Sequence, residues 1–354
     1  YCLAGALKHP DYRLQRINPY PDDWVVHPVD GYGDKALIRR LMNDLKPDAI
    51  WFMTDPRFYV WLWDMSSEVR KNVPMIYYHV WDNYPYPKFN KKYYDSNDMI
   101  CTISKVTDDI VRTVSPDVKC IRIPHTVDTN VFKKRSQEEE LKVRKTVSIE
   151  NPDKMVFFWN NRNARRKHSG TLIFWFKEFL DIVGHDDMTD GQILLSTNKM
   201  PPEDLANIYS AVDCTVNISD AEGFGLGTLE SLACETPIIV NMTGGLQEQV
   251  TDGEEWFGIG LEPSSKSVIG SQDVPYIHED RLAKKDVVDA FLKFYNMTKE
   301  EREEMGKKGR KHVMDNYSFA KYSGNWYEAF QHVFKNFGSW DTRKNYKHWS
   351  IEEL

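Results

Sequence analysis

The stretch Ser219–Val250, SDAEGFGLGTLESLACETPIIVNMTGGLQEQV, carries the strongest structural signal in this chain. It follows an apolar run that ends at Ile218 and enters a helical pattern through Gly223, Gly225 and Gly227. Glycines at such a place let the backbone approach a ligand closely, and the free N–H groups of a helix start favour a phosphate. The stretch therefore predicts a strand–turn–helix unit that can bind an anion.

Two acidic residues flank this expected anion site: Glu222 precedes the helix and Glu230 lies about two turns further on. A carboxylate beside a phosphate is unfavourable unless the ligand also carries hydroxyl groups, from which the carboxylate can accept hydrogen bonds. The pair therefore points to a ligand with both phosphate and polyol parts. The residues alone leave a second interpretation open, in which a glycine-rich turn is followed by acidic residues that the helix dipole favours in any case.

Short apolar runs alternate with helical periods along the rest of the chain, which is the pattern of parallel sheets covered by helices. In the first half we expect strands at 49–54, 75–79, 99–103 and 119–123, and helices around 35–45, 57–70, 88–94 and 105–114. In the second half we expect strands at 155–159, 193–196, 214–218 and 237–241, and helices at 202–212, 287–295, from 298 onwards and at 322–337. The polar segment 128–149 separates the two series.

Composition excludes several classes of protein. The 354 residues include 46 Lys plus Arg and 53 Asp plus Glu, a net charge of −7, which argues against a general binder of nucleic acid. No stretch approaches the roughly 18 uninterrupted apolar residues of a membrane span. The five cysteines are widely spaced and form no CxxC, which excludes a zinc ribbon or a disulfide framework and favours a reducing, cytoplasmic location. The length predicts about two domains.

The segment Glu222-Gly-Phe-Gly-Leu226, with Glu230 eight positions after Glu222, resembles the E-x7-E motif of GT4-type retaining glycosyltransferases. The resemblance implies an α/β protein with the GT-B fold, in which two Rossmann-like domains face a central cleft. It also implies that Glu222 binds the donor hexose and that Glu230 binds the ribose hydroxyls of the nucleotide. The other donor-binding residues expected on this basis are Ser219, Gly223, Phe224, the amides of Gly225 and Leu226, and the glycine pair Gly244 and Gly245.

A basic segment, Asn160-Asn-Arg-Asn-Ala-Arg-Arg-Lys167, follows the expected strand at 155–159. Four cations at the carboxyl end of a strand would bind a diphosphate well. The Arg-x4-Lys pair of the family matches Arg162 and Lys167, which the resemblance assigns to neutralising the leaving nucleotide diphosphate. By itself the run also fits a solvated basic loop.

The first half is similar to the family more loosely. Tyr77-Tyr-His79 resembles the strand whose histidine reaches the donor sugar, and we expect His79 at the site, although Val80 replaces the usual Asp and Asp82 comes later. Pro124-His-Thr-Val-Asp128 resembles the hinge at the end of the first domain. The chain departs from the family at Glu235 and Asn161, where glycine is usual.

The resemblance also implies domain boundaries. We expect an acceptor-side domain at 1–130, a linker at 131–150, a nucleotide-sugar-binding domain at 151–316, and a helix with a tail at 317–354 that crosses back to the first domain. Tyr1-Cys-Leu-Ala-Gly5 is similar to the second strand of the first domain. We therefore expect the first strand–helix unit to be missing from the printed sequence.

These features together imply transfer of a hexose from a UDP- or GDP-linked sugar to an unidentified glycan, lipid or small-molecule acceptor, with retained configuration. The resemblance implies that no metal and no cofactor beyond the nucleotide sugar is needed. Asp22-Asp23 and Asp186-Asp187 resemble fragments of the DxD motif of other transferases, but such pairs are common in loops. A lipid acceptor would imply peripheral membrane contact. The alternatives are a GT-B sugar phosphorylase or nucleotide-sugar epimerase, a DNA-base glucosyltransferase, and a catalytically silent sugar-nucleotide-binding protein.

Overall fold

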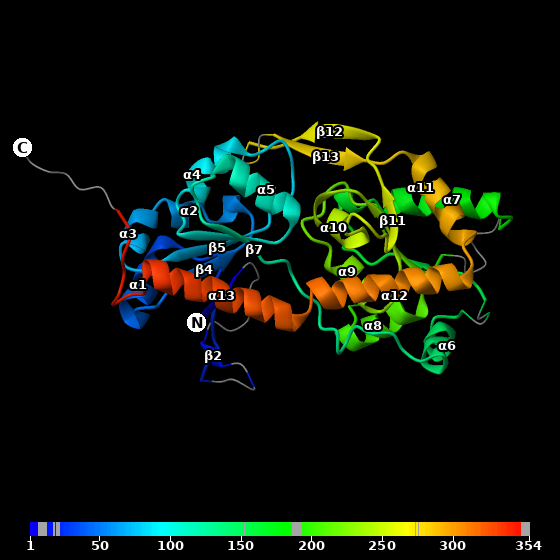
Figure 1. Cartoon of the computed structure of the whole chain (residues 1–354), viewed down its shortest axis with the longest axis horizontal. Helices are drawn as coiled ribbons and strands as arrows, with labels where there is room; N and C mark the ends of the chain where they lie inside the picture. The colour runs from blue at the N-terminus through cyan, green and yellow to red at the C-terminus, as the bar shows by residue number, and fades with distance from the viewer. Residues whose placement is uncertain are drawn as a thin grey trace, which may run out of the picture.

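Figure 1 shows the computed structural model of the chain, in which two α/β halves with parallel sheets lie side by side. The structure describes residues 1–5, 13–16, 18, 22–149, 151, 153–185, 193–197, 199–272, 274 and 276–347. The two halves are Rossmann-like domains, as the sequence predicts.

A parallel sheet of order β4-β5-β6-β7 forms the centre of the first half. Its strands are β4 (Ile50–Met53), β5 (Met75–His79), β6 (Met99–Thr102) and β7 (Cys120–Arg122). Every residue of β5 and β6 is buried, which explains why these strands appear in the sequence as continuous apolar runs. The helices of this half are α1 (Lys35–Leu45), α2 (Val60–Trp63), α3 (Ser66–Arg70), α4 (Lys91–Tyr94) and α5 (Lys105–Val114), with 3-10 turns η1 (Pro56–Phe58) and η2 (Lys88–Asn90).

A small separate sheet of order β1-β3-β2 precedes the main one. It consists of β1 (Cys2–Ala4), β2 (Gln15–Arg16) and β3 (Val25–Pro28), with β1 parallel and β2 antiparallel to β3. The segment Tyr1–Gly5 thus contains a strand, as expected. That this strand corresponds to the second strand of the family's first domain stays a prediction.

The second half repeats the parallel architecture with the order β11-β10-β9-β8. Its strands are β8 (Phe157–Phe158), β9 (Cys214–Asn217), β10 (Ile238–Asn241) and β11 (Gly258–Leu261). The helices are α7 (Ser169–Ile182), α8 (Pro202–Ala211), α9 (Leu226–Ala233), α10 (Gln247–Val250), α11 (Lys284–Tyr295) and α12 (Lys299–Asn316), with 3-10 turns η3 (Arg165–Lys167) and η4 (Gly244–Leu246). A hairpin of β12 (Ser265–Ile269) and β13 (Ile277–Arg281) follows β11.

The structure corrects two expectations about local elements and adds a helix to a third segment. The strand expected at 193–196 is not present, and Leu194 and Leu195 are 54% and 80% exposed. A four-residue apolar run cannot by itself distinguish a strand from an exposed loop. The helix expected at 57–70 is broken into η1, α2 and α3. The segment expected as a linker contains helix α6 (Gln137–Thr146), which a capping box of Ser136 and Glu139 begins.

The last helix, α13 (Phe319–Phe337), runs along the first half, whereas α12 runs along the second (Figure 1). Trp326 of α13 packs against Trp51 of β4 and Tyr78 of β5, with ring centroids 5.8 and 5.0 Å apart. One hydrophobic cluster accordingly contains buried residues of both sheets and of α13. Among the residues that the structure describes, no helix has the length and apolar character needed to cross a bilayer.

The end of α9 contains a residue in an unfavourable backbone conformation. Glu235 directly follows the cap of this helix with φ of 62°, and its N–H donates to the carbonyl of Leu232. This left-handed position after a helix is normally glycine, which agrees with the departure noted in the sequence. A Cβ on Gly306 of α12 would lie 2.0 Å from the Glu235 carbonyl oxygen, so α12 fixes this turn in place.

We expect the substitution Glu235→Gly to stabilise the protein. Removing the Cβ relieves ~1–2 kcal/mol of left-handed strain, and the greater freedom of glycine in the unfolded chain offsets ~0.5–1 kcal/mol of that gain. The net gain of about 0.5–1 kcal/mol can be measured by urea unfolding. Glu235→Ala is the matched control, because it removes the carboxylate but keeps the Cβ. Equal stability of the two variants would contradict the strain at this position.

Candidate functional site

The candidate site lies at the carboxyl ends of β8 and β9, where ligands bind in open parallel sheets. A pocket of about 60 Å³ opens there, and the N-terminus of α9 forms one wall of it. Side chains from three segments converge on this pocket: the loop after β8, the end of β9 and the turn that leads into α9. They include Asn160, Asn161, Lys167, Thr215, Asn217, Glu222 and Thr228.

Lys167 and Glu222 form an ion pair within the pocket. Their side chains are only 8% and 14% exposed. Burial and the neighbouring Arg166 lower the pKa of Lys167 to about 7, while Asp82 acts in the opposite direction. The ammonium group is therefore held by acidic neighbours in a place from which much of the water is excluded. An anionic ligand at this place would gain a strong, weakly screened partner.

The four cations of the basic segment separate in the structure. Arg166 donates to the carbonyl of Ala221 and lies 3.9 Å from Glu222, next to Lys167. Arg165 turns away and binds Glu279 of β13. Arg162 is exposed and makes no hydrogen bond or ion pair with any described residue. Two cations therefore contact the Glu222 turn, one serves another partner, and Arg162 remains open to solvent.

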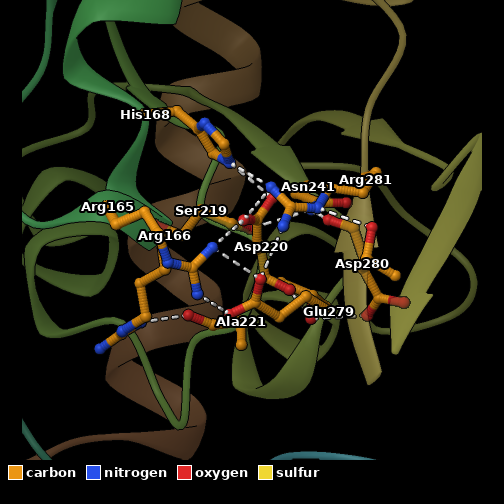
Figure 2. Close-up of polar contacts among 12 residues, drawn as sticks. Arg165, Arg166, His168, Ser219, Asp220, Ala221, Asn241, Glu279, Asp280 and Arg281 are labelled. Atoms are coloured by element: carbon orange, nitrogen blue, oxygen red, sulfur yellow. Dashed lines mark hydrogen bonds and ion pairs between the residues drawn. The ribbon is translucent and has the colours of Figure 1, made fainter. Parts of the chain in front are cut away.

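Figure 2 shows the buried polar network to which Arg165 belongs. Asp220, which is buried, pairs with His168 at 2.6 Å and with Arg281 at 2.7 Å. Glu279, which is also buried, pairs with Arg281 at 2.8 Å and with Arg165. Burial raises the pKa of Asp220, and its contacts with His168 and Arg281 oppose that shift. The network fixes β13 against the turn that carries Glu222, two residues after Asp220.

Glycines make the close approach of two loops possible at this turn. A Cβ on Gly244 would lie 1.9 Å from the carbonyl oxygen of Glu222, and one on Gly245 would lie 2.6 Å from the Cα of Phe224. The N–H of Gly245 donates to the Glu222 carbonyl at 3.0 Å. Gly225, with φ of 91°, is the residue directly before α9. The predicted glycines are therefore required where the two loops meet.

Glu230 lies on α9 next to Tyr209 of α8. Burial raises the pKa of Glu230 to about 7, and a hydrogen bond from the Tyr209 hydroxyl opposes this shift. The Tyr209 hydroxyl in turn accepts a hydrogen bond from the side chain of Asn160 at 3.0 Å. Asn160 lines the pocket, so this chain of contacts connects Glu230 with the loop that carries Lys167.

Three other residues predicted to belong to the site are buried in the structure. His79 is fully buried, its two ring nitrogens lie 2.9 and 2.7 Å from the hydroxyls of Tyr77 and Tyr94, and burial lowers its pKa to about 3. Ser219 is buried and donates to Asn217. The ring of Phe224 packs against other rings, so only its backbone could reach a ligand. Their roles in binding stay predictions, and His79 as packed here has no surface open to a ligand.

Asp82 is a candidate that the sequence analysis did not select. This half-buried residue follows β5, and its Oδ2 would lie 3.8 Å from a Cβ on Gly223. Burial raises the pKa of Asp82 to about 6, and Arg166 and Lys167 oppose this shift. Its place three residues after His79, just beyond the end of a buried strand, was the available signal.

Among the described residues, no group of three His, Cys, Asp or Glu side chains is arranged to hold a metal ion. Asp22 pairs with Arg16 at 3.2 Å. Asp186 and Asp187 lie outside the described residues.

The chain is similar to known proteins in part of its sequence and in its fold. Residues 192–312 match the family model described as glycosyl transferases group 1. A D-inositol 3-phosphate glycosyltransferase of Saccharomonospora viridis is 31% identical over 119 residues, which are 28% of this chain and 27% of that protein. An uncharacterized glycosyltransferase of Methanocaldococcus jannaschii is 25% identical over 188 residues, 48% of this chain and 45% of that protein. The chain therefore spans less than half the length of these relatives.

Solved structures share the fold over most of the chain. Sucrose-phosphate synthase from Thermosynechococcus elongatus superimposes with a TM-score of 0.70 at 15% identity, covering 92% of this chain and 86% of that one. HepE from Anabaena, in complex with UDP and glucose, gives a TM-score of 0.63 at 12% identity, with 87% and 86% covered. The shared architecture shows that this chain has the GT-B fold, and its residues 192–312 match the group 1 glycosyl transferase family.

Proposed function

We propose that the chain transfers a hexose from a UDP- or GDP-linked sugar to a hydroxyl group of an acceptor, with retained configuration and without a metal ion. The observation that carries this proposal is the convergence of Lys167, Glu222 and the N-terminus of α9 on one pocket. A cation and free amides suit a diphosphate, whereas a carboxylate at the same place suits sugar hydroxyls. The complex of HepE with UDP and glucose supports a nucleotide sugar as the ligand of this fold.

Donor binding in this scheme exchanges one ion pair for another. Without a donor, Lys167 and Glu222 neutralise each other and fill the pocket, which at about 60 Å³ is too small for a nucleotide sugar. A diphosphate would take Lys167 as its partner, together with the amides of Gly225 and Leu226 and the exposed guanidinium of Arg162. Glu222 is then released and can accept a hydrogen bond from a hexose hydroxyl.

The nucleoside would lie on the side of Glu230. A ribose offers two neighbouring hydroxyl donors, and an ionised carboxylate is their best acceptor. Glu230 is prepared for this role because it is half-buried and already oriented by the Tyr209 hydroxyl. Burial disfavours the ionised carboxylate and raises its pKa, so hydrogen bonds from ribose hydroxyls would stabilise the ionised form.

The chemical step breaks the bond between the anomeric carbon and the diphosphate oxygen and forms a bond from that carbon to the acceptor oxygen on the same face. The acceptor proton passes to the departing phosphate, so no protein nucleophile is required. Lys167 and Arg162 stabilise the negative charge that develops on the diphosphate, which is the contribution that a metal ion makes in other transferases. His79 has no part in this scheme because it is fully buried.

The clamp can be tested with Lys167→Ala. We expect at least a tenfold loss of affinity for the nucleoside diphosphate, since a charge-assisted hydrogen bond contributes about 1.5–3 kcal/mol and ~1.4 kcal/mol is tenfold in affinity. Calorimetry or thermal shift with UDP, GDP and ADP, each with EDTA or Mg²⁺, measures it. Lys177→Ala, on the exposed face of α7, is the matched control.

Unchanged binding by the Lys167 variant would place the diphosphate elsewhere. No binding of any of the three nucleotides to the wild-type protein would reject the proposed donor. Turnover that needs inorganic phosphate but no nucleotide would favour the phosphorylase alternative. A requirement for Mg²⁺ would reject the metal-independent scheme.

Glu230→Gln tests the ribose site through pH. In the wild-type protein, nucleotide affinity should fall as the pH drops through about 7, because protonation removes the carboxylate acceptor. In the Gln variant, affinity should be weaker and should no longer fall as the pH drops below about 7. The loss of affinity toward about pH 8.5, where Lys167 with its pKa of about 7 gives up its proton, should persist, so the comparison runs from about pH 5.5 to 8.5. A wild-type affinity that does not change across this range would contradict the assignment.

Glu230→Gln should weaken nucleotide binding but increase the folding stability of the protein at high pH. The pKa of Glu230 is higher in the folded protein than its ordinary value of 4.5, so the stabilising contribution is complete below that value and lost as the pH rises through about 7. Above pH 7 the neutral Gln avoids the burial of a charge. We expect Glu230→Gln to be more stable than the wild-type protein by on the order of 1–3 kcal/mol at pH 8 and equally stable at pH 4.

A further inference from the structure

The hairpin of β12 and β13 has two chemically different faces. Cross-strand pairs place Ser267 opposite Glu279 and Ser265 opposite Arg281 on one face, and Lys266 opposite Asp280 and Val268 opposite His278 on the other. The first face is turned to the buried network of Asp220 and Arg165 (Figure 2). Successive side chains of a strand alternate, so the second face points away from this network. On that face Asp280 accepts from the Thr243 hydroxyl at 2.8 Å, which leaves Lys266 and His278 available for another purpose.

The hairpin also reaches the first half of the molecule. In Figure 1 it lies along the top of the molecule, at the junction between the two halves. The backbone N–H of His278 donates to the carbonyl of Tyr84, and the side chain of Asn83 donates to the carbonyl of His278 at 3.1 Å. Val274, close to the tip, is buried in the hydrophobic core of the first half. The hairpin is therefore tied to both halves.

The second face of the hairpin lines a pocket between the two halves. Asp82 and Tyr84 come from the first half, Gly244 and Gln247 from the turn after β10, and Lys266, His278 and Asp280 from the hairpin. Gly244 connects this pocket with the proposed donor site: a Cβ there would lie 1.9 Å from the Glu222 carbonyl oxygen and 3.5 Å from the Cβ of Asp82. This pocket holds only about 20 Å³, so its residues form one side of a ligand site and do not enclose a whole sugar. A molecule bound to them would lie beside the place proposed for the hexose.

The polar groups of the pocket suit hydroxyl groups. Asp82 makes no hydrogen bond through its carboxylate to a described side chain, and neither Lys266 nor the His278 ring has a hydrogen-bond or ion-pair partner among the described residues. Gln247 donates its amide N–H to the carbonyl of Gly244 at 3.2 Å, and its side-chain oxygen accepts no hydrogen bond from a described residue. Acceptors and donors thus line the same pocket, together with Tyr84. A hydroxyl both donates and accepts, and a sugar ring also offers C–H faces to an aromatic side chain.

We propose that this pocket is the acceptor subsite, that it takes a hydroxyl-rich saccharide or polyol, and that Lys266 and His278 of the hairpin bind it together with Asp82. The inference rests on the proposed transfer reaction and adds the class of acceptor. Asp82 accepts a hydrogen bond from the attacking hydroxyl and orients it toward the hexose at Glu222. The proton itself still passes to the departing phosphate, so the balance of the reaction is unchanged.

The first experiment measures acceptor binding without turnover. Saturation-transfer NMR on the full chain, with and without the nucleotide that binds best, would use glucose, maltose, myo-inositol and glycerol as probes. We expect at least one of these probes to bind, and we expect Lys266→Ala and His278→Ala to weaken it about tenfold, the usual effect of losing one strong hydrogen bond. His278→Ala keeps both backbone contacts of the hairpin. Lys285→Ala, an exposed lysine on α11, is the control.

The second experiment separates acceptor from donor. With the UDP- or GDP-linked sugar that binds, release of nucleotide is measured in the absence and presence of the best probe. Lys266→Ala and His278→Ala should raise the KM for the probe about tenfold and leave the KM for the donor in hydrolysis within about twofold. Unchanged KM values for the probe would overturn the acceptor assignment. A change confined to the donor KM would also overturn it, and would indicate that the pocket binds the donor hexose.

Two further outcomes distinguish the inference from the reaction on which it rests. If the wild-type chain binds and hydrolyses a nucleotide sugar but none of the probes binds, the proposed function stands and the saccharide or polyol subsite is rejected; transfer to a lipid-linked acceptor instead would identify the class that replaces it. If no nucleotide binds and no nucleotide sugar is hydrolysed, the proposed function itself fails. Binding of a probe that depends on Lys266 would then still identify a saccharide site.

Discussion

The contact between two loops, one before α9 and one after β10, determines the geometry of the whole site. Gly244 and Gly245 allow the backbone after β10 to lie directly against Glu222 and Phe224, with a hydrogen bond of 3.0 Å from Gly245 to the Glu222 carbonyl. Any side chain at Gly244 would collide with that carbonyl. The orientation of Glu222, the start of α9 and the position of Asp82 across the cleft all follow from this close approach.

Around that contact, buried charge is balanced in two separate groups. Lys167 and Glu222 form one pair within the pocket, where each can exchange its partner for part of a ligand. Asp220 and Glu279 form the other group with Arg165, Arg281 and His168, where the partners lie outside the pocket. Removing one member of such a buried group leaves an uncompensated charge, which is strongly unfavourable. The second group therefore keeps β13 and the turn before α9 in place, while Lys167 and Glu222 can exchange partners when a ligand binds.

The hairpin of β12 and β13 contributes both to the buried ion-pair network and to the pocket between the two halves. Its anchored face carries Glu279 and Arg281, and its open face carries Lys266 and His278. The alternation of side chains along a strand separates the two roles without any extra structure. Glu248 of α10 joins the halves at another point, where its carboxylate accepts from the N–H of Lys105 and from Arg122, at 3.1 and 3.0 Å.

Local patterns in the sequence determined the parallel strands, the glycine turn and the pair Glu222 and Glu230, because spacing, backbone freedom and helix-start chemistry are properties of neighbouring residues. The same patterns could not determine that Arg165 serves Glu279 while Lys167 serves Glu222, since these partners are 114 and 55 positions apart. They could not place His79 among tyrosines or Asp82 opposite Gly223 either. Which charges meet, and which polar groups stay open to a ligand, depends on long-range packing, and only the tertiary structure decided it.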